Sequence, residues 1–246
     1  MRSIFLFAAF ATVFAGATVQ AQEDKDHKEH KEKSDKPKIE GSGNVITRDV
    51  NVQSFDELSI SGVFSVLLTQ GGKEGVKIEA DDNLQDLFEV KNEGSKLSIG
   101  MKKDVNFSSK KKMKVYITFK NLKNMDLKTV GDVTSEQNMN FTDLKLQNKS
   151  VGNVDLKLTA QKLDVDNKSV GNVKLNGKAD NVVIRNKSVG SIQAASFVVQ
   201  TMDIDNNGVG SAEVNAEKEL KVKDNMMGKV TNKGAATIKR SNKVVI

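Results

Sequence analysis

The chain has no cysteine and no tryptophan, and both of its histidines and its single proline lie before residue 38. Without cysteine there is no disulfide framework, no thiol nucleophile and no thiol for the lipid of a bacterial lipoprotein. The rest of the chain also lacks histidine, so Ser-His-Asp and Cys-His catalysis and the usual zinc sites are excluded there. Tyrosine occurs once. Aromatic platforms on which sugars or nucleic-acid bases stack are therefore scarce.

The first twenty-one residues are typical of a cleavable export signal. Arg2 supplies a positive start, residues 4–17 are almost wholly apolar, and Val19-Gln20-Ala21 is a small-residue cleavage motif. The apolar run is shorter than the ~20 residues that a membrane span needs. We therefore expect cleavage after Ala21, no transmembrane segment in the mature chain, and export to the periplasm or the cell surface. We do not expect a lipoprotein.

Residues 22–40 are almost all charged or polar, which predicts a solvated, disordered linker. His27 and His30 lie in this segment, and we interpret them as part of the spacer rather than as metal ligands. No metal ion or cofactor is expected. The formal net charge of +6 comes mainly from lysine. It favours acidic partners such as anionic polysaccharides or envelope components, whereas the absence of an arginine cluster argues against nucleic acid.

Residues 41–121 carry the alternating apolar and polar pattern of β-strands, interrupted by turn residues. Residues 92–94 predict a hairpin turn, and residues 82–88 are the one segment with the pattern of a helical turn. The expected strands are centred on residues 58–60, 63–68, 76–80, 97–99 and 113–119.

From residue 122 to residue 240 the sequence repeats itself. Copies that start at Leu144, Leu163, Val182, Met202 and Leu220 are 19, 19, 20 and 18 residues apart. No copy can bury its apolar face alone, but stacked copies at the strand spacing of ~4.8 Å form a continuous core. Helical repeats need ~33 residues or more per unit. The repeat therefore predicts an all-β domain over residues 41–246, a right-handed parallel β-helix-like solenoid with coils of about 19–20 residues.

Stacking the copies turns each repeat position into a column. The starting residues and the apolar residues two positions later are predicted to point inward, and so are Val151, Val170, Val189, Val209 and Met227. The column of Asn148, Asn167, Asn186 and Asn206, which ends in Asp224, predicts a ladder of amide hydrogen bonds at a bend. We prefer this interpretation to N-glycosylation, whose acceptor pattern three of these asparagines match. A glycine follows in every coil and predicts a backbone bend.

Two outward constellations are candidate sites. Lys149, Lys168 and Lys187 form a column that predicts a ridge for an anionic ligand; the alternative is solvated lysines that suppress edge aggregation. The second constellation is an acidic face, where β-helix polysaccharide enzymes place paired carboxyls. Arg185 is expected to pair there with Asp166 and Asp205, which favours a structural charge ladder over catalysis. The residues of this face are Asp164, Asp166, Arg185, Asp203 and Asp205.

These features together resemble a known family. The motifs are Gly41-Ser-Gly43-Asn44, Phe55-Asp-Glu-Leu58-Ser-Ile60-Ser-Gly62-Val63-Phe-Ser-Val66, Glu79-Ala-Asp81-Asp82-Asn83-Leu84, and the Val-Gly-x-Val coils that follow. The chain resembles the head domain of auto-transporter adhesins, also called the GIN domain, over residues 41–240. The resemblance implies a β-solenoid, export and adhesion, and it transfers no catalytic residue. Family members usually carry Ser-Gly-Ser-Gly at the bends, where this chain has Lys-Ser-Val-Gly.

We therefore expect an exported, non-enzymatic binding or adhesion-like module, with an anionic glycan as the favoured ligand class. The alternatives are a polysaccharide-active enzyme that uses the acidic face, and a purely structural envelope protein. The sequence leaves open whether the protein is a homo-oligomer.

Overall fold

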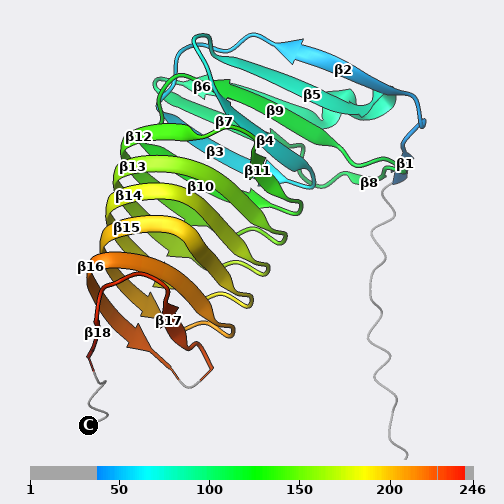
Figure 1. Cartoon of the computed structure of the whole chain (residues 1–246). Coiled ribbons are helices and arrows are strands. Elements are labelled where there is room, and N and C mark those ends of the chain that lie inside the picture. The colour runs from blue at the N-terminus through cyan, green and yellow to red at the C-terminus, as the bar shows by residue number, and fades with distance from the viewer. Residues whose placement is uncertain (1–37, 226, 242–246) are drawn as a thin grey trace, which may run out of the picture. The chain divides into compact units, whose positions relative to one another are not determined.

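The computed structural model describes residues 38–225 and 227–241. The predicted signal peptide and all of the predicted linker except residues 38–40 lie outside the described residues. The described residues belong to one compact unit, which is built almost entirely of β-strands (Figure 1). In the described residues no helix is long and apolar enough to cross a membrane.

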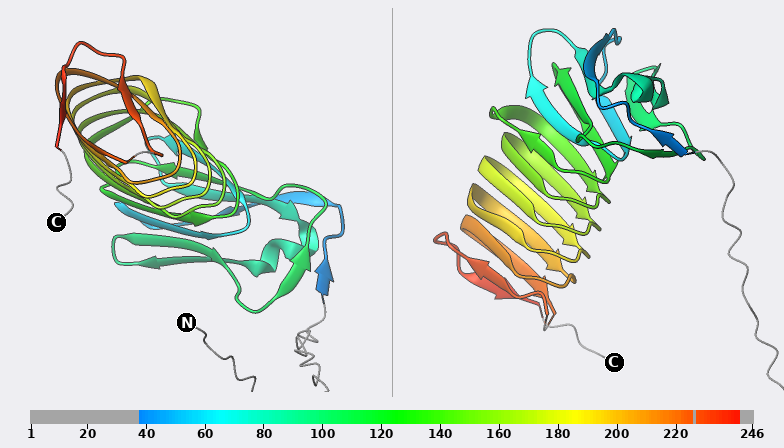
Figure 2. Two further views of the ribbon diagram at one scale, coloured as in Figure 1. Left: turned by 90° about the horizontal axis from the view of Figure 1, so that it is seen from below. Right: turned by 90° about the vertical axis from the view of Figure 1, so that its right-hand side faces the viewer.

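The repeat region forms the predicted β-solenoid. Each coil has two flat sides, and the same sides of successive coils pair in parallel with equivalent residues in register, as in Val165↔Ile184↔Ile204. Seen from below, the coils are flattened loops of similar outline stacked on one another (Figure 2). The strands are β10 (Asn124–Thr129), β11 (Val133–Ser135), β12 (Met139–Asn148), β13 (Val154–Asn167), β14 (Val173–Asn186), β15 (Ile192–Asn206), β16 (Ala212–Asp224), β17 (Val230–Asn232) and β18 (Ile238–Arg240).

Each long strand runs along one side of the coil, bends around one edge, and returns along the other side. At the opposite edge a five-residue turn links it to the next strand, for example residues 168–172 between β13 and β14. The 20-residue coil holds its extra residue in a bulge, where the register shifts between Lys174 and Gly177. Gly177 pairs with Phe197, so the column has no side chain directly above this phenylalanine.

The N-terminal section continues the same stack before it changes character. β3 (Glu57–Gly62) and β4 (Ser65–Gln70) pair in parallel with β10 and β11 and so form another coil. β7 (Lys96–Met101) and β9 (Lys114–Phe119) extend the two sides further. The remaining strands add antiparallel pairs, β2 (Val45–Val50) on β5 (Gly75–Asp81), β5 on β9, and β6 (Phe88–Glu93) on β7.

The local expectations for this section are confirmed. The β6–β7 hairpin turns through Gly94, whose φ is 59°, and a short 3-10 helix, η1, spans Asp82–Leu87. β1 (Lys38–Glu40) pairs in parallel with β8 (Asn106–Ser108) as a separate two-stranded sheet. The first described strand therefore begins three residues before the predicted boundary at residue 41.

The core is one continuous column of apolar side chains inside the coils. Leu144, Leu163, Val182, Met202 and Leu220 are buried as predicted, and so are the residues two positions later. Because each apolar layer rests on the layer of the next coil, removal of water from these side chains stabilises the stack as a whole.

One predicted inward column is wrong. Val130, Val151, Val170, Val189 and Val209 point outward with about half of their surface exposed, and Met227 is more exposed still. The reason lies in the three residues before Val151, Val170 and Val189: Asn is buried, Lys is exposed and Ser is buried, so strand alternation directs Val to the outside. The serine takes the inward place because it hydrogen-bonds the buried asparagine.

Candidate functional site

The two edges of the coils are different surfaces. We call the edge of five-residue turns the valine edge, after its outward column of Val130, Val151, Val170, Val189, Val209 and Met227. We call the opposite edge, where the long strands bend at residues such as Gln161 and Asp180, the groove edge, because an open groove runs along it.

A buried amide ladder supports the valine edge from inside. Asn148 Nδ2 donates to Asn167 Oδ1 at 2.9 Å, and Asn167 and Asn186 each donate in the same way to the next asparagine, at 2.8 and 2.6 Å. Each of the first three asparagines also accepts a hydrogen bond from the serine two residues later. The ladder predicted from the sequence is confirmed, and the asparagines are buried within it.

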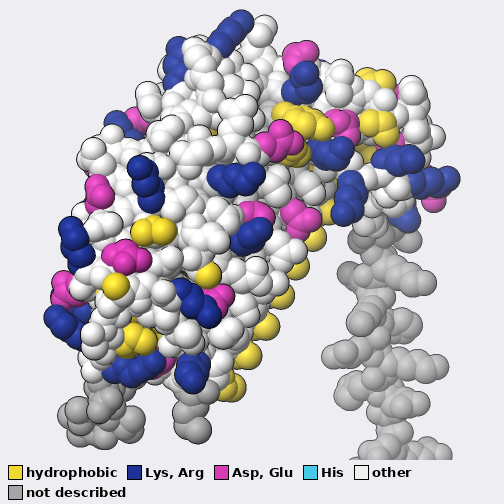
Figure 3. Space-filling view, in the orientation of Figure 1, with side chains coloured by type: hydrophobic (Ala, Val, Ile, Leu, Met, Phe, Trp, Pro, Cys, Tyr) yellow, Lys and Arg dark blue, Asp and Glu magenta, His cyan; other side chains and the backbone are white. Residues whose placement is uncertain are grey.

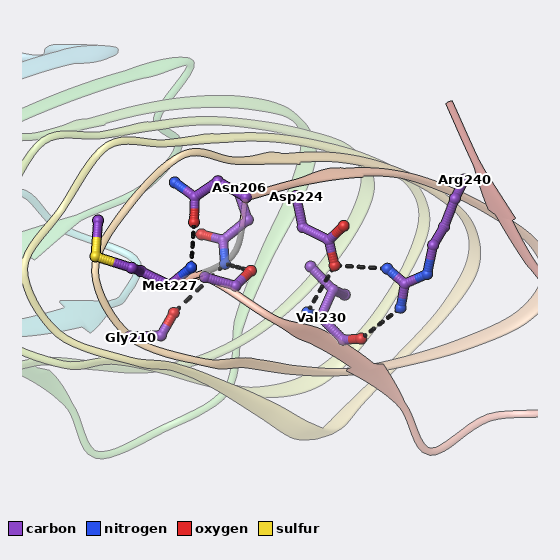
Figure 4. A network of polar contacts seen from close by, with 8 residues as sticks. Asn206, Gly210, Asp224, Met227, Val230 and Arg240 are labelled. Carbon is purple, nitrogen blue, oxygen red and sulfur yellow. Dashed lines mark hydrogen bonds and ion pairs between the residues drawn. The ribbon is translucent and has the colours of Figure 1, made fainter. Parts of the chain in front are cut away.

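The amide ladder ends at Asn206. Strand register places Asp224 opposite Asn206, as the sequence predicted, but the Asn206 amide donates to backbone carbonyl oxygens instead of to Asp224. Figure 4 shows this end: Asn206 Nδ2 donates to the carbonyl oxygen of Gly228, while Asp224 pairs with Arg240 at 2.5 Å and accepts from the backbone N–H of Val230. β17 and β18 close the last coil through backbone pairing with β16 and through the ion pairs Arg240–Asp224 and Lys239–Glu219.

A glycine is required directly after the outward valine. Gly171 has a φ of +136°, and a Cβ atom placed on it would lie 2.2 Å from the carbonyl oxygen of Gly152 in the coil above. The same close approach recurs at Gly152, Gly190 and Gly210. The predicted backbone bend is confirmed there, and the absence of a side chain lets the turns stack at strand spacing.

The lysine column predicted as a ligand ridge lies on the valine edge. Lys149, Lys168 and Lys187 are all exposed and precede the outward valines by two residues. Lys168 Nζ contacts Asp166 Oδ2 at 2.9 Å. Lys149 and Lys187 have no acidic partner within 4.0 Å among the residues that the structure describes.

The acidic face is assembled differently from the expectation. Strand register does place Arg185 between Asp166 and Asp205, but its guanidinium pairs with Asp164 Oδ2 at 3.0 Å. Asp166 pairs with Lys168 instead, and Asp205 accepts a hydrogen bond from Asn207. The predicted Asp166–Arg185–Asp205 ladder is therefore wrong. The acidic side chains are divided among separate local contacts.

The groove edge carries a hollow of about 1910 Å³ that spans successive coils from β12 to β15. Most of the residues that line it are polar or charged, and Leu122, Phe141 and Val198 add apolar surface. Gln70 lines the groove and is held against β12: its side-chain amide accepts from Asn140 N at 2.7 Å and donates to Asn140 O at 3.0 Å, as a neighbouring strand would. The lining also includes Gln161, Gln200, Lys145, Lys162, Lys178, Asp164 and Asp180.

Sequence reasoning missed this groove. Gln70 and Asn140 are seventy residues apart, and the lining residues share no local motif. The weak signal that was present is the polar composition of the bend itself, where Gln161-Lys162 and Asp180-Asn181 follow a buried alanine in successive coils. Asp164 is the one residue of the predicted acidic face that lines the groove.

The groups with shifted pKa values lie mostly in the N-terminal section. Hydrogen bonds from Lys114 Nζ and Tyr116 Oη, each at 2.8 Å, hold the pKa of Glu79 below its ordinary value. The same contact with Glu79 raises the pKa of Tyr116 and of Lys114. These side chains meet on the antiparallel β5–β9 pair and stabilise it.

The described residues contain no group of three or more acidic, histidine or cysteine side chains placed to hold a metal ion. On the predicted acidic face, Asp164 is paired with Arg185 and Asp166 with Lys168. The fold thus defines a class of protein: a repeat-built β-solenoid, here with a groove along one edge of its coils and a column of exposed valines along the other.

The comparisons with known proteins place the chain within that class. Residues 54–236 match the family described as "Putative auto-transporter adhesin, head GIN domain", and the chain belongs to this family. A "putative adhesin" from Bacteroides fragilis NCTC 9343 is 32% identical, with a TM-score of 0.71 over 82% of this chain and 100% of that one. The resemblance found in the sequence is confirmed.

Two more distant structures share the fold alone. A "putative adhesin" from Parabacteroides merdae ATCC 43184 is 18% identical, with a TM-score of 0.52 over 83% of this chain and 99% of that chain. A "putative lipid binding protein" from Parabacteroides distasonis ATCC 8503 is 16% identical, with a TM-score of 0.56 over 84% of this chain and 100% of that chain. No curated protein matches the chain.

Proposed function

We propose that this protein is an exported, non-catalytic binding module of the adhesion type, and that it binds glycan chains along the groove edge. The observation that carries the proposal is the open groove of about 1910 Å³ across the bends of β12–β15. The family and the 32% identical adhesin structure support the adhesion-like role.

The chemistry of the groove fits a polar polymer. The side-chain amides of Gln161, Gln200 and Asn140 each offer both a donor and an acceptor, as the hydroxyl groups of a sugar require. Lys145, Lys162 and Lys178 add positive charge that has no acidic partner within 4.0 Å in the described part of the chain, which favours acidic sugars. A groove that runs across successive coils suits an extended polymer better than a compact ligand.

A glycan-array screen of the purified protein, followed by titration of the best ligand, tests this proposal. The variant with Gln161→Ala, Lys162→Ala and Lys178→Ala should lose at least about tenfold in affinity, since several hydrogen bonds of about 1 kcal/mol each are removed. The matched control changes Lys149, Lys168 and Lys187 to alanine on the valine edge and should bind normally.

If the groove-edge variant binds normally and the valine-edge variant loses affinity, the glycan binds at the lysine column instead. The role of that column in glycan binding stays a prediction. Binding through lysine should weaken with salt, because exposed charges are screened over ~8 Å at physiological ionic strength. If no glycan binds at any salt concentration, the proposal fails and a purely structural envelope role takes its place.

The enzyme alternative rests on the acidic face and has less support. A glycosidase needs two carboxyls that flank one bond, one of them protonated as the general acid. Here the Arg185 guanidinium lies on Asp164, and Lys168 lies on Asp166. We expect no release of reducing ends from acidic or neutral polysaccharides. Release that disappears in Asp164→Asn or Asp166→Asn would refute the non-catalytic role.

We also propose that the chain reaches the periplasm or cell surface through cleavage after Ala21. The charged start, the short apolar stretch and the small-residue motif in the sequence support this step. Intact-mass measurement of the exported protein should give a chain that starts at Gln22, and a chain that retains residues 1–21 would contradict it.

A further inference from the structure

The valine edge carries a straight stripe of exposed hydrophobic side chains. Figure 3 shows hydrophobic side chains in a row at the outline of the coils. The stripe consists of the valine column, with Val151 and Val170 at 50% and 52% exposure. Val63, in the coil above Val130, is similarly exposed and continues it.

The fold does not require valine at these positions. The backbone forms only an isolated bridge from each valine to the next, and threonine meets the same β-branched preference while leaving a hydroxyl for water. Along the sides of the coils the outward positions carry charged side chains such as Lys145, Asp164 and Asp203. Seven apolar residues in one exposed line therefore indicate a surface that a partner covers.

Positive charge accompanies the stripe along its length. Lys149, Lys168 and Lys187 lie two residues before the valines, on the same outward side of the turns. At the N-terminal end the stripe meets a pocket of about 430 Å³. Val63, Phe107 and Val130 form part of its lining, and the exposed Lys110, Lys111 and Lys112 lie at its rim. Among the described residues, these three lysines have no acidic partner within 4.0 Å. The acid nearest the stripe in sequence is Asp132, two residues after Val130. Asp224, three residues before Met227, is paired with Arg240, and Asp166, four residues before Val170, is paired with Lys168.

The shape of the edge selects among the partners that this chemistry allows. A small apolar ligand would need a concave pocket that surrounds it, whereas the stripe lies on the projecting edge of the coils. A second copy is disfavoured by area, because seven half-exposed side chains offer much less than the ~800 Å² that a stable interface buries on each partner. A flat surface contacts every member of a straight projecting row at once, and the lysines favour one that is negatively charged.

We propose that the valine edge docks on a lipid bilayer with anionic headgroups, with the valine side chains in the headgroup region and the lysines against the phosphates. Burial of apolar side chains and attraction of lysine to anionic lipid are the two contributions that hold a protein on a membrane surface. This site is separate from the glycan groove, which lies on the opposite edge of the coils and stays free for its own ligand.

Vesicle cosedimentation of the purified protein tests the proposal. Vesicles of phosphatidylcholine are compared with vesicles of an equal mixture of phosphatidylcholine and phosphatidylglycerol, and binding is expected to the mixture and to weaken with salt. Replacing Val151, Val170 and Val189 by threonine should reduce the partition coefficient by about tenfold or more. Replacing Lys149, Lys168 and Lys187 by glutamine should reduce it by about a hundredfold, since each lysine near an anionic surface contributes about fivefold.

A matched control carries the same loss of charge on the other edge. The variant with Lys145→Gln, Lys162→Gln and Lys178→Gln should bind the vesicles as the wild type does. Because the chain has no tryptophan, Val170→Trp supplies a single fluorescent probe whose emission should shift to the blue on anionic vesicles, whereas Lys162→Trp should not shift. This readout holds even if the threonine variant is poorly folded.

Three results would overturn the docking proposal. The first is no binding to the anionic vesicles at low salt. The second is equal loss of binding in the valine-edge and groove-edge lysine variants, which would indicate attraction by net charge alone. The third is a concentration-dependent dimer, without vesicle binding, that the threonine changes convert to a monomer; the occupant would then be a second copy. The glycan titration is unaffected by any of these results, so the two proposals fail independently.

Discussion

Replacing Asn167 by aspartate tests the buried amide ladder, because the two side chains have the same shape and differ in one donor. Asn167 Nδ2 donates to Asn186 Oδ1 at 2.8 Å, while its Oδ1 accepts from Asn148 at 2.9 Å and from Ser169 at 2.8 Å. An ionised aspartate keeps both acceptor contacts, but its second oxygen faces the Asn186 oxygen at a site that is 1% exposed.

The magnitude follows from these contacts. An unsatisfied buried acceptor costs about 1–3 kcal/mol, and burial of a charge that two donors only partly compensate brings the expected loss in unfolding free energy to about 3–5 kcal/mol. For a domain of this size that corresponds to a fall in Tm of about 10 °C. Because domains are stable by only about 5–15 kcal/mol, the variant should still fold but with a small margin.

The pH dependence separates this explanation from a general loss of packing. A protonated aspartic acid donates as the amide does, so the pKa of the new carboxyl should be raised above its unfolded value of about 3.9. The variant should then be nearly as stable as the wild type below pH ~4, where its new carboxyl is protonated, and this stability should be lost as the pH rises through the raised pKa. Thermal unfolding followed by circular dichroism across this range gives the measurement.

The matched control is Asn172→Asp on the outside of the same coil. Asn172 is exposed, and its Oδ1 accepts from Ser191 N at 2.9 Å, a contact that aspartate retains. Its Tm should stay within a few degrees of wild type. Equal losses of Tm in the two variants, or an Asn167→Asp loss that does not change with pH, would refute the ladder as a source of stability.

Three further changes address other parts of the fold. Gly171→Ala should destabilise by about 3 kcal/mol or more, because the new Cβ meets a carbonyl oxygen at 2.2 Å; Gly72→Ala, which has nothing within 4 Å, should be nearly neutral in denaturant unfolding. Ile184→Asp buries an unpaired carboxylate and should unfold the domain. Lys187→Asp, on the exposed valine edge, should change the free energy of unfolding by less than about 1 kcal/mol. Similar melting of the two variants would contradict the assignment of Ile184 to the inside and Lys187 to the outside. The pKa of Glu79 is lowered from 4.5, chiefly by its hydrogen bond from Lys114. The contribution of Glu79 to stability is therefore present above pH 4.5 and is lost as the pH falls through the lowered pKa. Glu79→Gln should flatten the acid side of the plot of Tm against pH, and an unchanged plot would contradict this.

The repeat allowed the solenoid to be predicted because one constraint acts on every copy. Burial of an apolar face and pairing with the next coil both require the same residue type at the same position, so columns such as Val165, Ile184 and Ile204 are visible in the sequence. The asparagine ladder was predicted for the same reason: its hydrogen bonds run between equivalent residues of neighbouring coils.

Prediction from the sequence was wrong where a polar residue takes an inward place. Ser150 and Ser169 are buried because each hydrogen-bonds the asparagine two residues before it, and this directs the following valine outward. Hydrophobicity alone assigns the valine to the core and the serine to solvent. The side-chain partner of Arg185 was also missed. Strand register places Asp166 directly opposite Arg185, but the long arginine side chain reaches diagonally across to Asp164.

The groove was beyond prediction for a different reason. It depends on where the coils bend and on Gln70, which caps β12 from a strand that lies far away in the sequence. Outward residues at the bend are constrained by neither packing nor pairing. Gln161-Lys162, Asp180-Asn181 and Gln200-Thr201 accordingly differ from coil to coil, and no column marks them as a site.

The valine column recurs at a place where neither core packing nor the amide ladder acts. Inside the coils, packing and the amide ladder account for the residues that recur; outside, where neither acts, the bends of the groove edge vary in residue type from coil to coil. The valine column lies outside, yet Val130, Val151, Val170, Val189 and Val209 do not vary. The glycine beside each valine has a backbone explanation, since no Cβ fits there, but threonine would satisfy the backbone equally at the valine itself. What keeps the outward column apolar must therefore act on the surface of the folded protein, and a partner that contacts the whole edge at once would do so in every coil.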